Sequence, residues 1–167
     1  MLLSPSVMKN LTLTFFLIFI TSGLFAQKSR SVHRSTIPSQ VAKQGICGTV
    51  VEKRGNYMPG PDRPTPKGKP MEREVLIFPL LNQSQVDMGE NGFINSVGDV
   101  KPVVTVKSKA DGTFCARVPP GRYSVVVREP KGLYANLSDT QNNIFPVTVA
   151  KDKQAQVKVE ITHQAVF

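Results

Sequence analysis

Short segments after residue 44 have the apolar patterns of β-strands, and the alternation of apolar and polar side chains within them constrains the fold more than any other feature. In the segment 155–162, Val157, Val159 and Ile161 alternate with polar residues. Successive side chains of a strand point to opposite faces, so such a segment buries one face and exposes the other. Similar short segments, rich in β-branched residues, lie at 44–52, 74–81, 103–107, 113–118, 122–128 and 144–149. With no helical period, the pattern predicts an all-β fold over residues 44–167: a seven-stranded sandwich of two sheets, antiparallel or mixed.

The first 26 residues have the order of features that is typical of an export signal. A short basic segment at 8–10 precedes an apolar run at 11–20, and the small residue Ala26 stands at the expected cleavage point. The alternative is a membrane anchor, but the apolar stretch is shorter than the about 20 residues that a span needs. We therefore predict a cleaved signal peptide, followed by a flexible basic arm at 27–43. The mature protein, with no further transmembrane span, is expected in the periplasm, at the cell surface or outside the cell.

The chain has two cysteines, Cys47 and Cys115, which lie 68 positions apart. This separation fits neither a CxxC redox motif nor zinc-ligand spacing. In an exported protein an even number of cysteines favours a disulfide. Alternation places each cysteine on the face of its strand opposite the core residues, so the two sulfurs can meet if the strands at 44–52 and 113–118 are neighbours. The alternative is two free thiols.

Positive charge is concentrated in the first half of the mature chain. The whole chain has a formal net charge of +9; residues 27–73 hold ten Lys or Arg against three acidic residues, whereas residues 74–167 hold ten against nine. This distribution favours anionic partners, and it leaves open a polyanion- or carbohydrate-binding protein that uses the basic half. No nucleic acid is expected as a partner, because aromatic residues do not interleave with the basic ones.

Two long loops form the candidate binding surface. Residues 53–73 contain five prolines, which make the loop stiff and water-exposed, and residues 82–102 form the second loop. The predicted binding residues are Tyr57, Met58, Arg63, Lys67 and Lys69 from the first loop and Phe93 from the second. The partner would be an envelope protein or a glycan. The alternative for Tyr57 and Met58 is simple packing against the end of the sandwich.

Residues suited to catalysis or to metal binding are scarce. After the signal only two histidines remain, His33 in the arm and His163 at the end of the last strand, and neither has zinc-ligand spacing. We therefore expect no enzyme activity, no metal and no cofactor. A hydrolase with an unrecognised site is the alternative, with Asp111 and Asp139 as its candidate carboxylates, although both look like turn residues. A buried His–carboxylate cluster in the structure would undo the interpretation of the protein as a non-catalytic sandwich.

Three short motifs resemble those of a known family. Residues 45–50 read GICGTV, residues 111–114 read DGTF, with a predicted hairpin turn, and residues 118–125 read VPPGRYSV. In this order they resemble the carboxypeptidase regulatory-like domains of the single-domain, exported bacterial type. The resemblance implies a prealbumin-like (transthyretin-like) sandwich that acts as an accessory module. The motifs are structural and the zinc peptidase domain of the family is missing, so the expected function is non-catalytic binding or structural support at the cell envelope.

Overall fold

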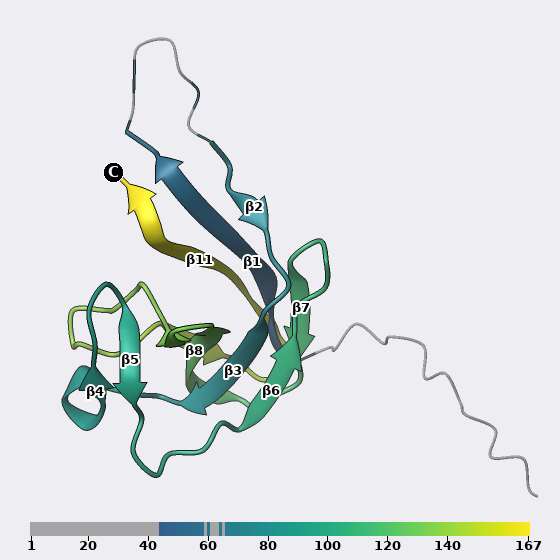
Figure 1. The fold of residues 1–167 in the computed structure, drawn as a ribbon. Helices are drawn as coiled ribbons and strands as arrows, with labels where there is room; N and C mark the ends of the chain where they lie inside the picture. Colours follow the sequence, from purple (N-terminus) through teal and green to yellow (C-terminus); the bar gives the residue numbers. More distant parts are fainter. Residues whose placement is uncertain (1–43, 59, 61–63, 65) are drawn as a thin grey trace, which may run out of the picture. The chain divides into compact units, whose positions relative to one another are not determined.

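The strands of the protein form two β-sheets that pack against each other (Figure 1). The computed structural model describes residues 44–58, 60, 64 and 66–167. The predicted signal peptide, the predicted arm at 27–43 and Arg63 lie outside the described residues. The sheets confirm the all-β sandwich that the alternation predicts. None of the described residues forms a helix long and apolar enough to cross a membrane.

The smaller sheet has four strands and the larger sheet has seven. The smaller sheet contains β1 (Gly45–Asn56), β2 (Lys69–Pro70), β7 (Thr113–Ala116) and β11 (Gln154–Val166). The larger sheet contains β3 (Glu74–Pro79), β4 (Asp87–Met88), β5 (Phe93–Ser96), β6 (Val104–Lys107), β8 (Gly121–Glu129), β9 (Gly132–Tyr134) and β10 (Pro146–Val149). A short 3-10 helix, η1 (Gln83–Gln85), lies between β3 and β4.

Each of the seven predicted strands is present, and four short strands accompany them. The additional strands β2, β4, β5 and β9 span two to four residues each. The first three lie inside the two predicted loops, and β9 lies between the predicted strands at 122–128 and 144–149. Segments this short cannot show a period of two, so alternation does not detect them. The two long loops are thus partly incorporated into the sheets.

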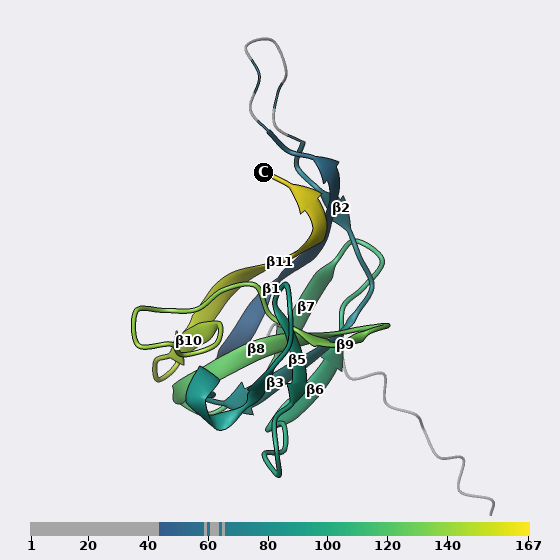
Figure 2. The ribbon, with the colours of Figure 1, turned by 60° about the vertical axis from the view of Figure 1, so that its left-hand side comes forward.

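Strand β1 lies in the middle of the smaller sheet and sets its topology. It runs parallel to β11 and antiparallel to β2 and β7, so the sheet is mixed (Figure 2). The pairing places Cys47 directly opposite Cys115, and the two form a disulfide with their Cα atoms 4.1 Å apart. Cys115 is exposed, and neither cysteine belongs to the core cluster. The predicted bridge on the outer face of the sheet is confirmed.

The turn at residues 111–112 carries the chain from one sheet to the other. It joins β6 of the larger sheet to β7 of the smaller one, so the predicted hairpin is wrong, although the predicted turn is present. Gly112 has a φ of +77°, and a Cβ there would lie 2.5 Å from the carbonyl oxygen of Val50. Glycine is required at this position because it alone has no Cβ. Hydrogen bonds from the Thr113 hydroxyl and N–H lower the pKa of Asp111.

Two strands continue their inward-facing pattern with a charged or titratable side chain. In β8 the fully buried Val127 is followed two residues later by Glu129, which is 5 % exposed. In β11 the buried Ile161 is followed two residues later by His163, whose side chain is 9 % exposed. Alternation therefore directs a carboxylate and an imidazole towards the space between the sheets.

Candidate functional site

A hollow of about 430 Å³, here named the β2 hollow, lies between the end of β1 and the segment that leads into β2. It is lined by Glu52, Arg54, Tyr57, Pro66, Lys67, Gly68 and Lys69. Three predicted binding residues, Tyr57, Lys67 and Lys69, therefore meet around one hollow. Arg54 donates a 2.9 Å hydrogen bond to the buried carboxylate of Glu52, so that pair is electrically balanced.

Tyr57 and Met58 have different environments although they are adjacent. The Tyr57 side chain is buried, its ring centroid lies 5.8 Å from that of Phe167, and its N–H donates to the carbonyl of Val166. The ammonium group of Lys53 lies 5.5 Å from the Tyr57 ring centroid. Tyr57 therefore packs against the end of β11. This agrees with the alternative prediction, in which Tyr57 packs against the end of the sandwich. Met58 is 54 % exposed and leaves an apolar side chain on the surface.

The second hollow, of about 120 Å³ and here named the Glu129 hollow, shares Arg54 with the first. Its lining also includes Arg73, Phe93, Glu129, Pro130, Lys131, His163 and Gln164. Phe93 is thus separated from the other predicted binding residues and belongs to this neighbouring hollow. Its ring packs against His163, with the centroids 5.0 Å apart.

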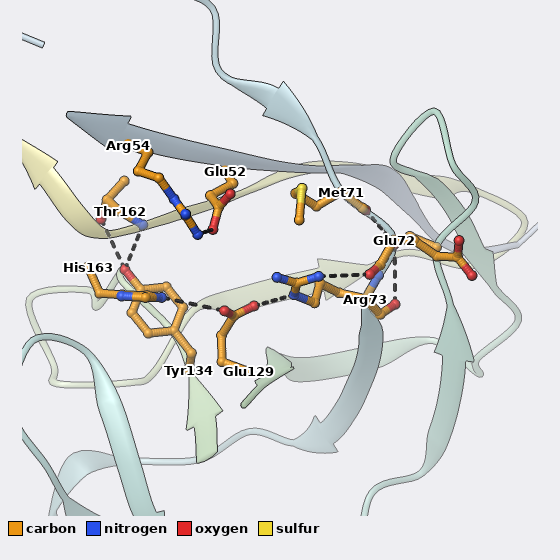
Figure 3. Close-up of polar contacts among 10 residues, drawn as sticks. Glu52, Arg54, Met71, Glu72, Arg73, Glu129, Tyr134, Thr162 and His163 are labelled. Atoms are coloured by element: carbon orange, nitrogen blue, oxygen red, sulfur yellow. Dashed lines mark hydrogen bonds and ion pairs between the residues drawn. The ribbon is translucent and has the colours of Figure 1, made fainter. Parts of the chain in front are cut away.

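Glu129 is the centre of a buried polar cluster between the two sheets (Figure 3). Arg73 Nε donates to Glu129 Oε1 at 2.5 Å, and His163 Nε2 lies 3.4 Å from Glu129 Oε2. Glu129 ends β8, Arg73 stands just before β3, and His163 belongs to β11. A buried carboxylate is costly unless it is paired, and here a guanidinium supplies the compensating charge.

The backbone around Arg73 is fixed by one serine. Ser108 is buried, its hydroxyl accepts a hydrogen bond from the Arg73 N–H at 2.8 Å, and its own N–H donates to the Arg73 carbonyl at 2.9 Å. The Ser108 hydroxyl also donates a 2.9 Å hydrogen bond to the carbonyl oxygen of Met71. These contacts hold the start of β3 against the end of β6, and so they position the guanidinium over Glu129.

The Glu129–His163 pair is a buried His–carboxylate cluster, which would favour an enzyme. Whether it could catalyse a reaction depends on the groups around it. One oxygen of Glu129 is occupied by Arg73, and the His163 ring packs against the rings of Phe93 and Tyr134. Within the described part of the chain, no hydroxyl or thiol is hydrogen-bonded to His163, and both cysteines are in the disulfide. Nucleophilic catalysis needs such a group beside the base. The absence of enzyme activity remains a prediction.

The two carboxylates considered for a hydrolase lie in separate turns. Asp139 accepts hydrogen bonds from the side-chain amide and N–H of Asn143 and from the N–H of Gln141, and these bonds lower its pKa. Asp111 is held in its own turn, as described above. The β2 hollow and the Glu129 hollow hold one carboxylate each. Among the described residues, no group of three or more His, Cys, Asp or Glu side chains could hold a metal ion.

The carboxylate of Glu160, on the side of β11 that faces away from the core, is bound by two lysines. Lys53 Nζ lies 2.6 Å from one of its oxygens and Lys158 Nζ lies 2.6 Å from the other. Partial burial raises the pKa of Glu160, but the hydrogen bonds from Lys158 and Lys53 outweigh it and leave the pKa below its ordinary value. This network fixes Lys53 beside the Tyr57 ring.

We expect stability to decline on the acid side because three carboxylates have lowered pKa values in the folded protein. Between the folded and unfolded pKa values of Asp111, Asp139 and Glu160 the unfolded chain binds more protons, so stability rises with pH. The contribution is complete above about pH 5 and is lost as the pH falls below about 4, through the folded values. Urea unfolding across this range measures the slope. Asp139→Asn should make the slope shallower, and an unchanged slope would contradict the assignment; Asp152→Asn, in an exposed turn, is the control.

Glu129 and Arg73 of the buried cluster are not predicted from the sequence, and His163 is considered there only to be set aside as a metal ligand. The signal that could have found two of them is their position in the alternation, because each follows a buried apolar residue of its strand at a spacing of two. Arg73 carries no such signal, since it precedes its strand.

Comparisons with known proteins do not assign the chain to a family. No family model matches the sequence, and no curated protein matches it either. The resemblance to the carboxypeptidase regulatory-like domains therefore remains a prediction from three motifs.

Proposed function

We propose that this protein is an exported, non-catalytic binding module of the cell envelope, and that it holds an anionic ligand in the β2 hollow and the Glu129 hollow. The observation that carries the proposal is an excess of positive charge. The two hollows are lined by five cationic side chains, Arg54, Lys67, Lys69, Arg73 and Lys131, and by two carboxylates. Both carboxylates are already ion-paired with arginines.

Three of the cations remain available to a ligand. Lys67, Lys69 and Lys131 are exposed, and no ion pair within the described ranges involves them. Clustered cations around a concave surface concentrate field lines and attract anions. The Cys47–Cys115 disulfide supports an oxidising compartment, and the resemblance stated above supports an accessory role.

The proposal is tested with an acidic polysaccharide, heparin, in low-salt buffer. We expect the triple variant Lys67→Ala/Lys69→Ala/Lys131→Ala to bind roughly tenfold more weakly, because each exposed charge contributes about 0.5 kcal/mol. Binding should also weaken as salt is added. The readout is the dissociation constant from titration calorimetry.

The matched control removes the same charge elsewhere. Lys109, Lys151 and Lys153 are exposed and line neither hollow, so their joint replacement with alanine should change affinity little. An equal loss in the two triple variants would show that net charge alone governs binding, and it would contradict the proposed surface.

A hydrolase is the second candidate, favoured by one observation, the buried Glu129–His163 pair. It predicts that the protein shortens a bound glycan and that His163→Gln abolishes this reaction. The binding module predicts intact glycan after prolonged incubation with either form. Mass spectrometry of the recovered glycan distinguishes the two functions.

A further inference from the structure

A third hollow, of about 440 Å³, lies next to the Glu129 hollow and has a different chemical character. Its polar lining consists of amide and hydroxyl side chains together with one imidazole, and we name it the amide hollow. These side chains are Gln83, Asn91, Tyr134, Asn136, Ser138, Thr162 and His163. No Asp, Glu, Lys or Arg side chain lines it, in contrast to the two cationic hollows.

Shared lining residues connect the three hollows. His163 lines both the amide hollow and the Glu129 hollow, and Arg54 lines both the Glu129 hollow and the β2 hollow. The contact of the Phe93 and His163 rings lies where the amide hollow meets the Glu129 hollow, since Gly92 lines the first and Phe93 the second. A ligand that extends from the amide hollow into the Glu129 hollow passes from amide and hydroxyl groups to cationic groups.

One buried atom beside the amide hollow lacks a partner. The side-chain oxygen of Asn136 is buried and makes no hydrogen bond with any described residue. An unsatisfied buried acceptor is unfavourable. Rotation of the amide towards a ligand hydroxyl would satisfy this oxygen, so a donor-rich ligand would gain a hydrogen bond there.

The lining of the amide hollow fits sugar hydroxyl groups. Each Asn or Gln amide both donates and accepts hydrogen bonds, as a sugar hydroxyl does. Phe167 also lines the hollow and is 63 % exposed, so it offers an aromatic surface beside the amides. A polyanion without hydroxyl groups can accept hydrogen bonds from the amide N–H groups, but it offers no hydroxyl donor to the amide oxygens.

We infer that the ligand is an acidic glycan, with the hydroxyl groups of one sugar unit in the amide hollow and acidic groups of the glycan in the two cationic hollows. This inference rests on the proposed function, because it specifies the class of anion that the cationic hollows hold. Recognition then has two separable parts: Lys67, Lys69 and Lys131 attract the acidic groups, and the amides select for sugar.

The experiment compares three probes by titration calorimetry: oligogalacturonate, polyglutamate of matched length and charge, and the neutral maltohexaose. We expect oligogalacturonate to bind at least tenfold more tightly than polyglutamate. Asn136→Ala should reduce the affinity for oligogalacturonate to the polyglutamate level and leave polyglutamate binding unchanged. The lysine triple variant should weaken the binding of both anions.

Two further variants keep the test decisive. Gln83→Ala removes a lining amide from a different segment, and it should give the same selective loss if Asn136→Ala fails to fold. Asn95→Ala removes an exposed amide outside the hollow and should change nothing. Equal affinity for the two anions, or an equal loss for both in Asn136→Ala, would overturn the sugar subsite and leave the proposed function standing. Failure of both anions to bind would overturn the proposed function itself.

Discussion

Replacing Cys47 and Cys115 together with serine should lower the free energy of unfolding by about 4 kcal/mol, on the chain-entropy account of cross-links. The bridge joins β1 to β7 across a sequence separation of 68 residues. Without it the unfolded chain gains the freedom of this long loop, whereas the folded sheet keeps its β1–β7 hydrogen bonds. A loss of this size is a large part of the 5–15 kcal/mol that stabilises a typical domain.

Urea unfolding in the presence and absence of dithiothreitol measures this effect. The reduced wild-type protein should unfold at the midpoint of the double serine variant, and the reductant should not shift the variant further. Each single serine variant should resemble the double variant once reductant is present. Two alkylatable thiols in the native, unreduced protein, or a midpoint that is indifferent to reductant, would contradict the prediction.

The sequence predicts the larger part of the fold because burial imposes a period of two. Some strands, such as β11, show this period, whereas β3 and β8 are recognised by their runs of apolar, β-branched residues. Side-chain alternation also assigns Cys47 and Cys115 to the face of their strands opposite the core residues. The two-residue strand β2 is too short to show an alternating pattern. Its pairing with β1 depends instead on where the preceding loop brings the chain back to the sheet. The turn at 111–112 is predicted from local backbone preference, but which sheet each flanking strand joins depends on long-range packing.

The candidate site is less predictable than the fold, because its residues meet across the two sheets. Three of the predicted binding residues meet around one hollow because they are close together in the chain; these are Tyr57, Lys67 and Lys69. Arg73, Glu129 and His163 come from three separate strands or their borders, and no local spacing relates them. The alternation indicates that Glu129 and His163 face inwards, but it does not indicate which side chain each one meets.

Arg73→Ala should destabilise the protein by about 3–5 kcal/mol, the usual cost of removing one partner of a buried ion pair. Glu129 is 5 % exposed, so its carboxylate would stay in the interior without the guanidinium that now donates to it. His163, at 3.4 Å, is the remaining titratable neighbour of that carboxylate. Chemical unfolding at neutral pH gives the change in free energy. Arg122→Ala is the control, because Arg122 pairs with Asp139 at the surface and an exposed pair contributes about 0–1 kcal/mol.

A double variant separates the charge of the cluster from its packing. Arg73→Met/Glu129→Leu removes both charges and keeps similar volumes, so we expect it to recover most of the stability that Arg73→Ala loses, since desolvation of the carboxylate is no longer required. If the double variant loses as much stability as Arg73→Ala, the packing of side chains at this site, and not the unpaired charge of Glu129, causes the destabilisation. A loss in Arg73→Ala no larger than in Arg122→Ala would show that water reaches Glu129.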